Sequence, residues 1–262
     1  MSAGRIIATR DGHIARLTID HVRRRNAMTL EMWRELGRHC REIAADREVR
    51  VVVLAGAGEL AFCAGADISE FKDNRSSEAA VETYDQAVAD ASRALASLPK
   101  PTIALIKGVC FGGGMGLAMS CDVRLASSTA RFRIPTAKLG LGYPFESLAL
   151  LVQKLGPGTV ADILYSARVV TAEEAQRLHI TQITWPEAEF DQSANNYVQQ
   201  IAANAPLTLA AVKAALVELS KAHGAVGSPV VEEMVKACFS SADYQEGQNA
   251  FREKREPRFR GN

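Results

Sequence analysis

Two short glycine-rich segments, 49 residues apart, constrain this chain more than any other feature. Phe62–Asp67 reads FCAGAD and Phe111–Gly116 reads FGGGMG, and each follows an apolar run typical of a β-strand. Small residues leave backbone N–H groups open to a ligand, because no bulky side chain blocks its approach. Two such groups converging on one point would form an oxyanion hole, which stabilises negative charge on a carbonyl oxygen. The two segments therefore predict chemistry on a carbonyl compound.

The composition excludes several classes of protein. A formal net charge of +1 provides no global field to recruit nucleic acid or an acidic membrane, so neither partner is expected. The N-terminus lacks the basic-then-apolar pattern of a signal peptide, and the longest apolar stretch, residues 102–123, contains a lysine and several glycines. The five cysteines form no C-x-x-C pair, which argues against a disulfide framework or a zinc site. We expect a soluble, cytoplasmic protein without a bound metal.

Short apolar strands alternate with helices in the first part of the chain, which predicts an α/β fold. Residues 6–9 and 14–20 flank a turn at Asp11-Gly12 and read as a hairpin. Further strands are expected at 51–54, 102–106 and 123–126, and helices at 29–46, 77–97 and 115–120. After residue 144 the pattern becomes mainly helical, over 191–204, 208–223, 228–240 and 241–256. We therefore expect an α/β core over 1–200 and a helical part over 201–262.

One apolar run imitates a nucleotide-binding fingerprint. Residues 51–61 read VVVLAGAGELA, a strand followed by G-x-G-x-x-A. That fingerprint must open directly into a helix whose N-terminus faces a pyrophosphate. Here the segment 62–67 interrupts the pattern within seven residues. We therefore reject a dinucleotide site and expect no cofactor.

Four segments, in order and at matching spacing, resemble the enoyl-CoA hydratase/isomerase (crotonase) superfamily over nearly the whole chain. Asn26–Met28 resembles the family's N-A-L/M segment, and Ala61–Ile68 resembles its F-x-A-G-A-D-[IL] loop. Residues 100–122 resemble K-P-x-I-A … G-G-G-x-E-L-A-x-x-C-D, and residues 250–259 resemble A-F-x-E-K-R-x-P-x-F. The resemblance implies a spiral of β-β-α units with a helical C-terminal part used in trimer packing. It also implies trimers that pair into hexamers.

The resemblance further implies a ligand, an acyl-CoA thioester that is the substrate and whose carbonyl sits between two backbone N–H groups. Carried over by position, these groups belong to Ala64 and Gly113. Phe251 and Lys254 match positions that contact the adenine end of CoA, frequently across a subunit boundary. The other candidate substrate-binding residues are Arg25, Ala27, Gly65, Ala66, Asp67, Ile68, Thr136 and Tyr143.

Some of these residues have simpler alternative roles. The run Arg23–Arg25 would lie near the CoA phosphates if the resemblance holds, but a charge run is also typical of a solvated loop. Phe251 and Lys254 could equally be a packing residue and part of a solvated tail. Asp67 fits a loop or capping residue better than a base, because its carboxylate can accept hydrogen bonds from neighbouring N–H groups.

Two carboxylates that hydration requires are absent from the positions where the resemblance places them. Adding water across an α,β-unsaturated thioester needs a base to activate the water and an acid to protonate the α-carbon. Family hydratases carry one glutamate two residues after the third glycine of G-G-G, where this chain has Gly116. The other follows the proline of F-x-x-P-E, where this chain has Thr136. We therefore expect double-bond isomerisation or another enolate reaction in preference to hydration.

Glu146 is the candidate acid/base that remains. It follows Pro144 in the segment that lines the family's acyl pocket, where members that shift double bonds place an acid about two residues earlier. One carboxylate suffices for such a shift because it returns the proton that it removes. Pro144 would start a helix whose dipole favours an ionised Glu146, and Tyr143 is a candidate hydrogen-bond donor to the acyl group. The alternative is a surface glutamate that stabilises a helix start.

Two other functions compete with an enzyme. A non-catalytic acyl-CoA-binding protein would keep the oxyanion hole and lack the acids. An RNA-binding role is known for a relative in the superfamily, but the near-zero net charge and the lack of a basic, aromatic-lined stripe argue against it.

Overall fold

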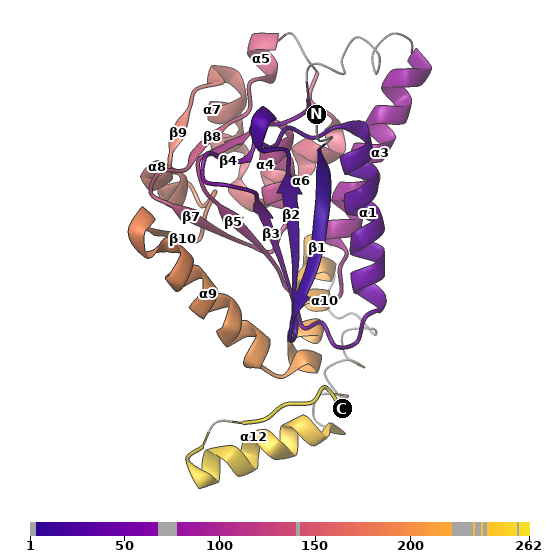
Figure 1. Cartoon of the computed structure of the whole chain (residues 1–262), viewed down its shortest axis with the longest axis vertical. Coiled ribbons are helices and arrows are strands. Elements are labelled where there is room, and N and C mark those ends of the chain that lie inside the picture. Colours follow the sequence, from indigo (N-terminus) through magenta and orange to yellow (C-terminus); the bar gives the residue numbers. More distant parts are fainter. Residues whose placement is uncertain are drawn as a thin grey trace.

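The strands in the described part of the chain form two sheets, seen in Figure 1. The computed structural model describes residues 4–67, 78–139, 142–221, 233, 237, 240–255 and 257–262. The six-stranded sheet has the order β1 (Arg5–Asp11), β2 (Ile14–Asp20), β3 (Val51–Gly56), β5 (Thr102–Ile106), β7 (Val123–Ser127) and β10 (Ile183–Trp185). The four-stranded sheet has the order β4 (Ala61–Cys63), β6 (Val109–Phe111), β8 (Arg131–Arg133) and β9 (Val170–Thr171).

The two sheets are linked by a repeated β-β-α unit, as the resemblance implied. A strand of the large sheet leads into a strand of the small sheet and then into a helix. The first unit is β3, β4 and α3 (Glu78–Ala96), the second is β5, β6 and α4 (Gly113–Ser120), and the third is β7, β8 and α5 (Thr136–Leu139). Successive units pair in parallel in both sheets. The carboxyl ends of β4 and β6 therefore meet at one edge.

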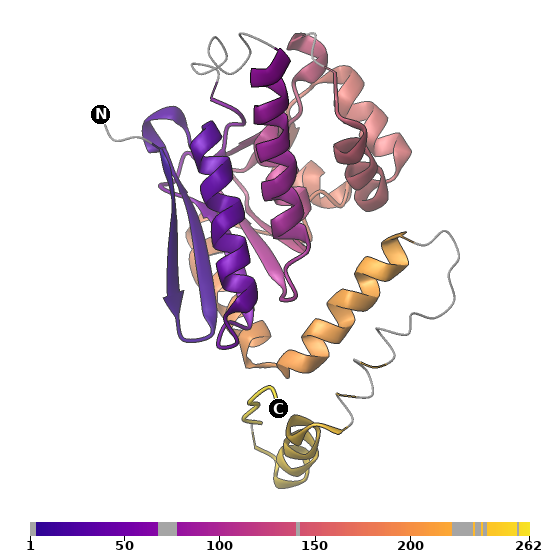
Figure 2. The ribbon, with the colours of Figure 1, turned by 90° about the vertical axis from the view of Figure 1, so that its right-hand side faces the viewer.

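Helices cover both faces of the large sheet. On one face, α1 (Leu30–Ala45) and α3 lie side by side (Figure 2), and their buried side chains share one hydrophobic cluster with Val52 and Leu54. On the other face, α9 (Glu187–Ala203) packs on Val51 and Val53. This alternation along β3 is the period of two that a strand buried on both faces imposes.

The remaining elements extend the spiral beyond the third unit. They are η1 (Val22–Arg24), α6 (Phe145–Leu155), α7 (Pro157–Ser166), α8 (Ala172–Arg177), α10 (Pro206–Lys221) and α12 (Ala242–Glu253). Figures 1 and 2 show α10 and α12 extending away from the sheets. The division into 1–200 and 201–262 stays a prediction. No single described helix is long and apolar enough to cross a membrane.

Many of the expected elements are present. The hairpin β1–β2 is confirmed, and α1 begins as predicted with the Thr29 hydroxyl accepting a hydrogen bond from the Met32 N–H at 3.2 Å. The small sheet and β10 were missed, because strands of two or three residues are too short to show a periodic pattern. The helix expected over 228–240 lies almost entirely outside the described residues.

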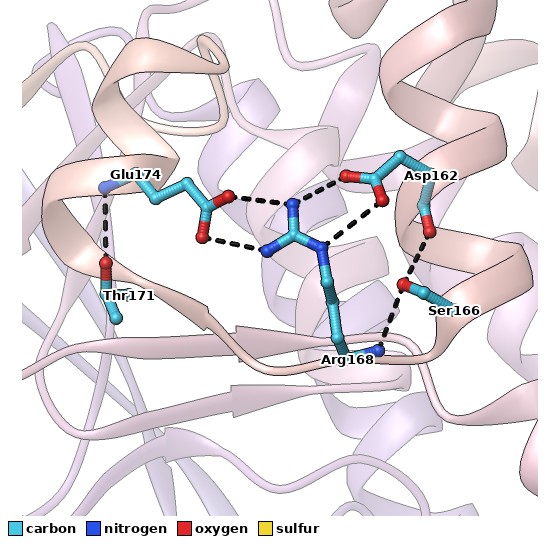
Figure 3. A network of polar contacts seen from close by, with 5 residues as sticks. All are labelled: Asp162, Ser166, Arg168, Thr171 and Glu174. Atoms are coloured by element: carbon cyan, nitrogen blue, oxygen red, sulfur yellow. Dashed lines mark hydrogen bonds and ion pairs between the residues drawn. The ribbon is translucent and has the colours of Figure 1, made fainter.

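An arginine joins the segments that follow the third unit, as shown in Figure 3. The Arg168 guanidinium forms ion pairs with Asp162 of α7 at 2.5 Å and with Glu174 of α8 at 2.8 Å. These hydrogen bonds lower the pKa of both carboxyl groups. Beside it, the Arg133 side chain donates to the Ala167 carbonyl at 2.7 Å, which ties the end of β8 to the same turn. The segment that leads to Thr136 is thus held to the turn at Ala167.

Candidate active site

The two glycine-rich segments meet where β4 and β6 end. A Cβ added at Gly65 would lie 3.2 Å from the Phe111 carbonyl oxygen and 3.5 Å from the Gly113 nitrogen. Gly65 also has φ +108°, a conformation that residues with a side chain rarely adopt. Glycine is required here because the two backbones approach each other so closely. The sequence prediction that these segments lie together is confirmed.

The backbone N–H groups of Ala66 and Gly113, which lie at this meeting point, donate to no acceptor among the described residues. Met28 donates to the Gly65 carbonyl at 2.8 Å and accepts from the Asp67 N–H at 2.9 Å. Because successive N–H groups of extended backbone point to opposite sides, the Ala66 N–H is directed away from Met28. Gly113 is the first residue of α4, and N–H groups of a first helical turn have no acceptor within the helix.

These two N–H groups belong to peptides that are neighbours in space, one from each glycine-rich segment. A Cβ added at Gly113 would be 3.7 Å from the Ala66 nitrogen. The N-terminal end of α4 adds a partial positive charge at the same place. The arrangement suits an oxygen atom that carries negative charge.

The structure corrects the assignment of Ala64 to this pair. The Ala64 N–H donates to the Arg25 carbonyl at 3.0 Å, so it is already engaged within the protein. Ala64 and Ala66 have the same side chain and lie two residues apart, and the sequence does not show which of their N–H groups is satisfied internally. Ala66, predicted only as a general substrate contact, is the residue with the open N–H group.

The Asn26 side chain holds the backbone next to the glycine-rich segment 62–67. Its side chain is 1% exposed and bonds three backbone groups: it accepts from the His21 N–H at 3.0 Å and donates to the carbonyls of Ala57 at 2.9 Å and Ala61 at 2.7 Å. Asn26 has φ +57°, a conformation that asparagine tolerates better than most residues. It therefore fixes the turn that presents the Arg25 carbonyl to Ala64.

Replacing Asn26 with leucine is expected to lower the free energy of unfolding by roughly 3 kcal/mol, because buried backbone groups lose their partners. Urea denaturation of the full chain measures this loss. Asn196→Leu is the matched control, because Asn196 is an exposed residue of α9 and its loss is expected to cost less than about 0.5 kcal/mol. Equal effects of the two substitutions would contradict the role of Asn26.

Gly116 and Thr136, the positions where the resemblance implies the two hydratase glutamates, border the same site. Apart from the backbone of α4 itself and the two neighbouring residues, no described atom lies within 4 Å of a Cβ added at Gly116, one turn along α4 from Gly113. Thr136 is half-buried at the start of α5. The Gly112 N–H donates to the Arg133 carbonyl at 2.8 Å, and the Pro135 ring lies 3.9 Å from a Cβ added at Gly112. These contacts place the segment before Thr136 against the glycine-rich turn.

Glu146 lies farther out, on the rim of a groove between α3 and α6. Its side chain is 81% exposed, and a carboxylate oxygen is 3.7 Å from the Arg93 guanidinium of α3. Ser120, at the end of α4, lines the same groove. Tyr143 is packed against the core, and burial raises the pKa of its hydroxyl to about 12, so it remains a hydrogen-bond donor near neutral pH.

Comparison with known proteins assigns the family. The family model described as enoyl-CoA hydratase/isomerase matches residues 9–262. The chain belongs to the enoyl-CoA hydratase/isomerase family. It is 32% identical over 255 residues to a short-chain-enoyl-CoA hydratase of Clostridium acetobutylicum, covering 97% of each chain. It is 31% identical over 217 residues to a methylmalonyl-CoA decarboxylase of Escherichia coli, covering 82% of each.

A solved structure supports the same assignment. An enoyl-CoA hydratase/carnithine racemase from Magnetospirillum magneticum is 34% identical to this chain, with a TM-score of 0.94 over 100% of this chain and 97% of the other. Relatives of this family member thus include proteins named for hydration and for decarboxylation, so family membership alone does not select a reaction.

The CoA-contact positions predicted for this family member are not all brought together in one chain. Arg25 is exposed next to η1, where β2 ends, whereas Lys254 directly follows α12, and α12 lies at the foot of the molecule in Figure 1. Ile68 and the side chain of Phe251 lie outside the described residues.

Two other predicted substrate contacts, Ala27 and Asp67, lie in the glycine-rich segment 62–67 or next to it. Ala27 is buried, and its carbonyl accepts a hydrogen bond from the His21 ring at 2.9 Å. The Asp67 carboxylate is 6% exposed and lies 3.8 Å from Arg24 and 4.0 Å from His21. These contacts fit the loop role weighed for Asp67 from the sequence.

Proposed function

We propose that this protein acts on acyl-CoA thioesters through a thioester enolate whose oxygen accepts hydrogen bonds from the N–H groups of Ala66 and Gly113. The observation that carries the proposal is this pair of open N–H groups on adjacent peptides. Removing a proton from the α- or γ-carbon moves an electron pair onto the thioester oxygen. Donors already fixed in place stabilise that charge without reorganisation during the reaction.

The favoured reaction is a shift of the double bond, or another enolate reaction, rather than hydration. Hydration needs two proton-transfer groups, and Gly116 and Thr136 supply neither carboxylate. We assign the proton transfer to Glu146, which would take a proton from one carbon and return it to the other. Its place in the same groove as Ser120 of α4 supports this assignment.

The proposed assembly is a trimer, or a hexamer formed from two trimers. Three large apolar residues on one face of α10 support association between copies, because they are 53%, 61% and 66% exposed: Val212, Leu216 and Leu219. In such an assembly, Lys254 of one copy would contact the CoA nucleotide bound near Arg25 of its neighbour.

The test is proton NMR in D₂O of the protein with crotonyl-CoA and a 3-enoyl-CoA. We expect deuterium at the α- or γ-carbon, or migration of the double bond, and we expect Glu146→Gln to slow this by about 100-fold. Glu82→Gln is the matched control, because Glu82 lines the opposite wall of the groove on α3. Unchanged exchange in Glu146→Gln would remove the catalytic assignment of Glu146, and 3-hydroxyacyl-CoA as the main product would contradict the preference for isomerisation.

A second candidate is an acyl-CoA-binding protein without catalysis. The 81% exposure of the Glu146 side chain favours it, because a solvated carboxylate is a poor match for proton transfer in a closed site. It predicts that CoA esters bind and that no deuterium enters either substrate. The same NMR experiment, combined with calorimetric binding of crotonyl-CoA, separates the two candidates.

A further inference from the structure

The Cys63 side chain lies inside the turn that carries the Ala66 N–H group. Cys63 is the last residue of β4 and is fully buried. Its sulfur accepts a hydrogen bond from the Gly65 N–H at 3.4 Å, and its S–H donates to the Gly65 carbonyl oxygen at 3.7 Å. A thiol is a weak donor and a weak acceptor, and here it serves as both. Cys63 therefore holds the glycine whose φ of +108° shapes the turn.

The Gly65 carbonyl and the Ala66 N–H are the two ends of one peptide unit. A trans peptide unit is planar, so its C=O and N–H point in opposite directions and turn together. The Met28 N–H donates to the Gly65 carbonyl oxygen at 2.8 Å, and the Cys63 thiol donates to the same oxygen. Because these bonds fix the carbonyl, they also fix the direction of the Ala66 N–H. They polarise the same unit as well, which makes its N–H a stronger donor.

The backbone of Cys63 also contacts the helix that carries the second donor. A Cβ added at Gly114, the second residue of α4, would overlap the Cys63 carbonyl oxygen and would lie 2.9 Å from the Cys63 Cβ. Glycine permits this close approach because it has no side chain. Gly114 directly follows Gly113, whose N–H is the other open donor. Cys63 thus contacts both segments that form the proposed oxyanion hole.

Burial keeps the Cys63 thiol in the form that can donate a hydrogen bond. It raises the pKa of the thiol to about 12, and the hydrogen bond from the Gly65 N–H opposes this rise only in part. The thiol is therefore protonated near neutral pH. Since the thiolate is the reactive form of cysteine, a buried neutral thiol is a poor nucleophile. Cys63 is thus suited to hold the turn and not to form a covalent intermediate.

We propose that Cys63 is a positioning residue for the oxyanion hole, whose thiol orients the Gly65–Ala66 peptide and whose backbone spaces that peptide from the start of α4. The inference rests on the proposed function, because it takes the enolate oxygen to lie between the N–H groups of Ala66 and Gly113. The thiol acts through its two hydrogen bonds. A hydroxyl at position 63 should therefore replace it, and a methyl group should not.

The first test compares Cys63→Ala, which removes both hydrogen bonds, with Cys63→Ser, which keeps a donor and an acceptor. Deuterium exchange into a 3-enoyl-CoA gives kcat and KM. Cys63→Ala is expected to lower kcat by about tenfold, less than the loss of a whole donor, because the Ala66 N–H remains but is less well aimed. KM is expected to change by less than about twofold, since the donor acts mainly on the charge of the enolate. Cys63→Ser is expected to keep kcat within about threefold of the unsubstituted protein.

Cys40→Ala is the matched control, because Cys40 is an equally buried thiol that lies in α1, outside both glycine-rich segments. It loses the same sulfur atom and is expected to keep full activity. A drop in kcat that followed stability alone would appear in both alanine variants. Urea denaturation of each variant measures that stability.

The second test is infrared spectroscopy of bound butyryl-CoA labelled with ¹³C at the thioester carbonyl, which needs no turnover. Hydrogen bonds from the oxyanion hole weaken the carbonyl bond, so the labelled band is expected at lower wavenumber in the bound ester than in the free ester. Cys63→Ala is expected to reduce this shift. Cys63→Ser and Cys40→Ala are expected to preserve it, because neither removes a hydrogen bond from the turn.

The two tests separate failure of the inference from failure of the proposed function. An undiminished shift and full kcat in Cys63→Ala, or equal losses in Cys63→Ala and Cys63→Ser, would overturn the inference. If Cys63→Ala does not fold, Cys63→Thr and Cys63→Val take its place, since they share one shape and differ in the hydroxyl. Equal shifts in that pair would also overturn the inference. A bound ester with no shift in the unsubstituted protein, or an ester that does not bind, would instead overturn the proposed function.

Discussion

Introducing glutamate at both Gly116 and Thr136 is expected to increase hydration of crotonyl-CoA by at least about 100-fold, because general acid–base groups contribute on this scale. Both positions border the glycine-rich turn that presents the Gly113 N–H. Outside the backbone of α4 and the two neighbouring residues, no described atom lies within 4 Å of a Cβ added at Gly116, so the helix can accept a side chain there. Loss of absorbance of the conjugated thioester measures the hydration.

The matched control is the double substitution Gly116→Gln and Thr136→Gln, which adds side chains of the same size without a group that transfers protons near neutral pH. It is expected to leave hydration unchanged. Each single glutamate is expected to give much less than the pair, because water activation and carbon protonation are separate tasks. Hydration by the unsubstituted protein as fast as by the double glutamate variant would show that other residues already supply both groups.

The fold could be predicted from the sequence where long elements have a clear period or a clear end signal. The Thr29 cap and the apolar spacing of α1 identified that helix, and the β-branched run at 51–54 identified a strand buried on both faces. The short strands β4, β6 and β8 are defined by pairing with residues far away in the chain, and three residues carry too little local pattern.

The candidate site was also predicted only in part, because some of its features depend on local residues and others on long-range contacts. The glycines of 62–67 and 111–116 indicated an open backbone, because glycine conformations and close approach are properties of the residues themselves. The choice between Ala64 and Ala66 depends on which N–H the Arg25 carbonyl occupies, which is a long-range contact. The groove between α3 and α6 was not predicted, because its walls come from helices that are far apart in the sequence.

Removing the N–H group of Ala66 or of Gly113 is expected to reduce kcat by about 100- to 1000-fold, the usual cost of one oxyanion-hole donor. Proline removes the N–H, and it is tolerated as the first residue of a helix, which is the place of Gly113 in α4. At Ala66 the substitution breaks no internal hydrogen bond, since that N–H has no described acceptor. The readout is deuterium exchange into the acyl-CoA, with circular dichroism as the measure of folding.

Three controls separate the lost donor from other effects of these substitutions. Gly113→Ala adds the same Cβ, 3.3 Å from the Trp33 ring, but keeps the N–H, so any further loss in Gly113→Pro comes from the missing donor. Glu187→Pro places proline at the first residue of α9, far from the site in sequence, and is expected to keep full activity. Ala64→Pro is expected to destabilise the fold, because it breaks the bond to the Arg25 carbonyl. Full activity of a folded Ala66→Pro variant would show that another donor stabilises the oxyanion. It would contradict the geometry on which the proposed function rests.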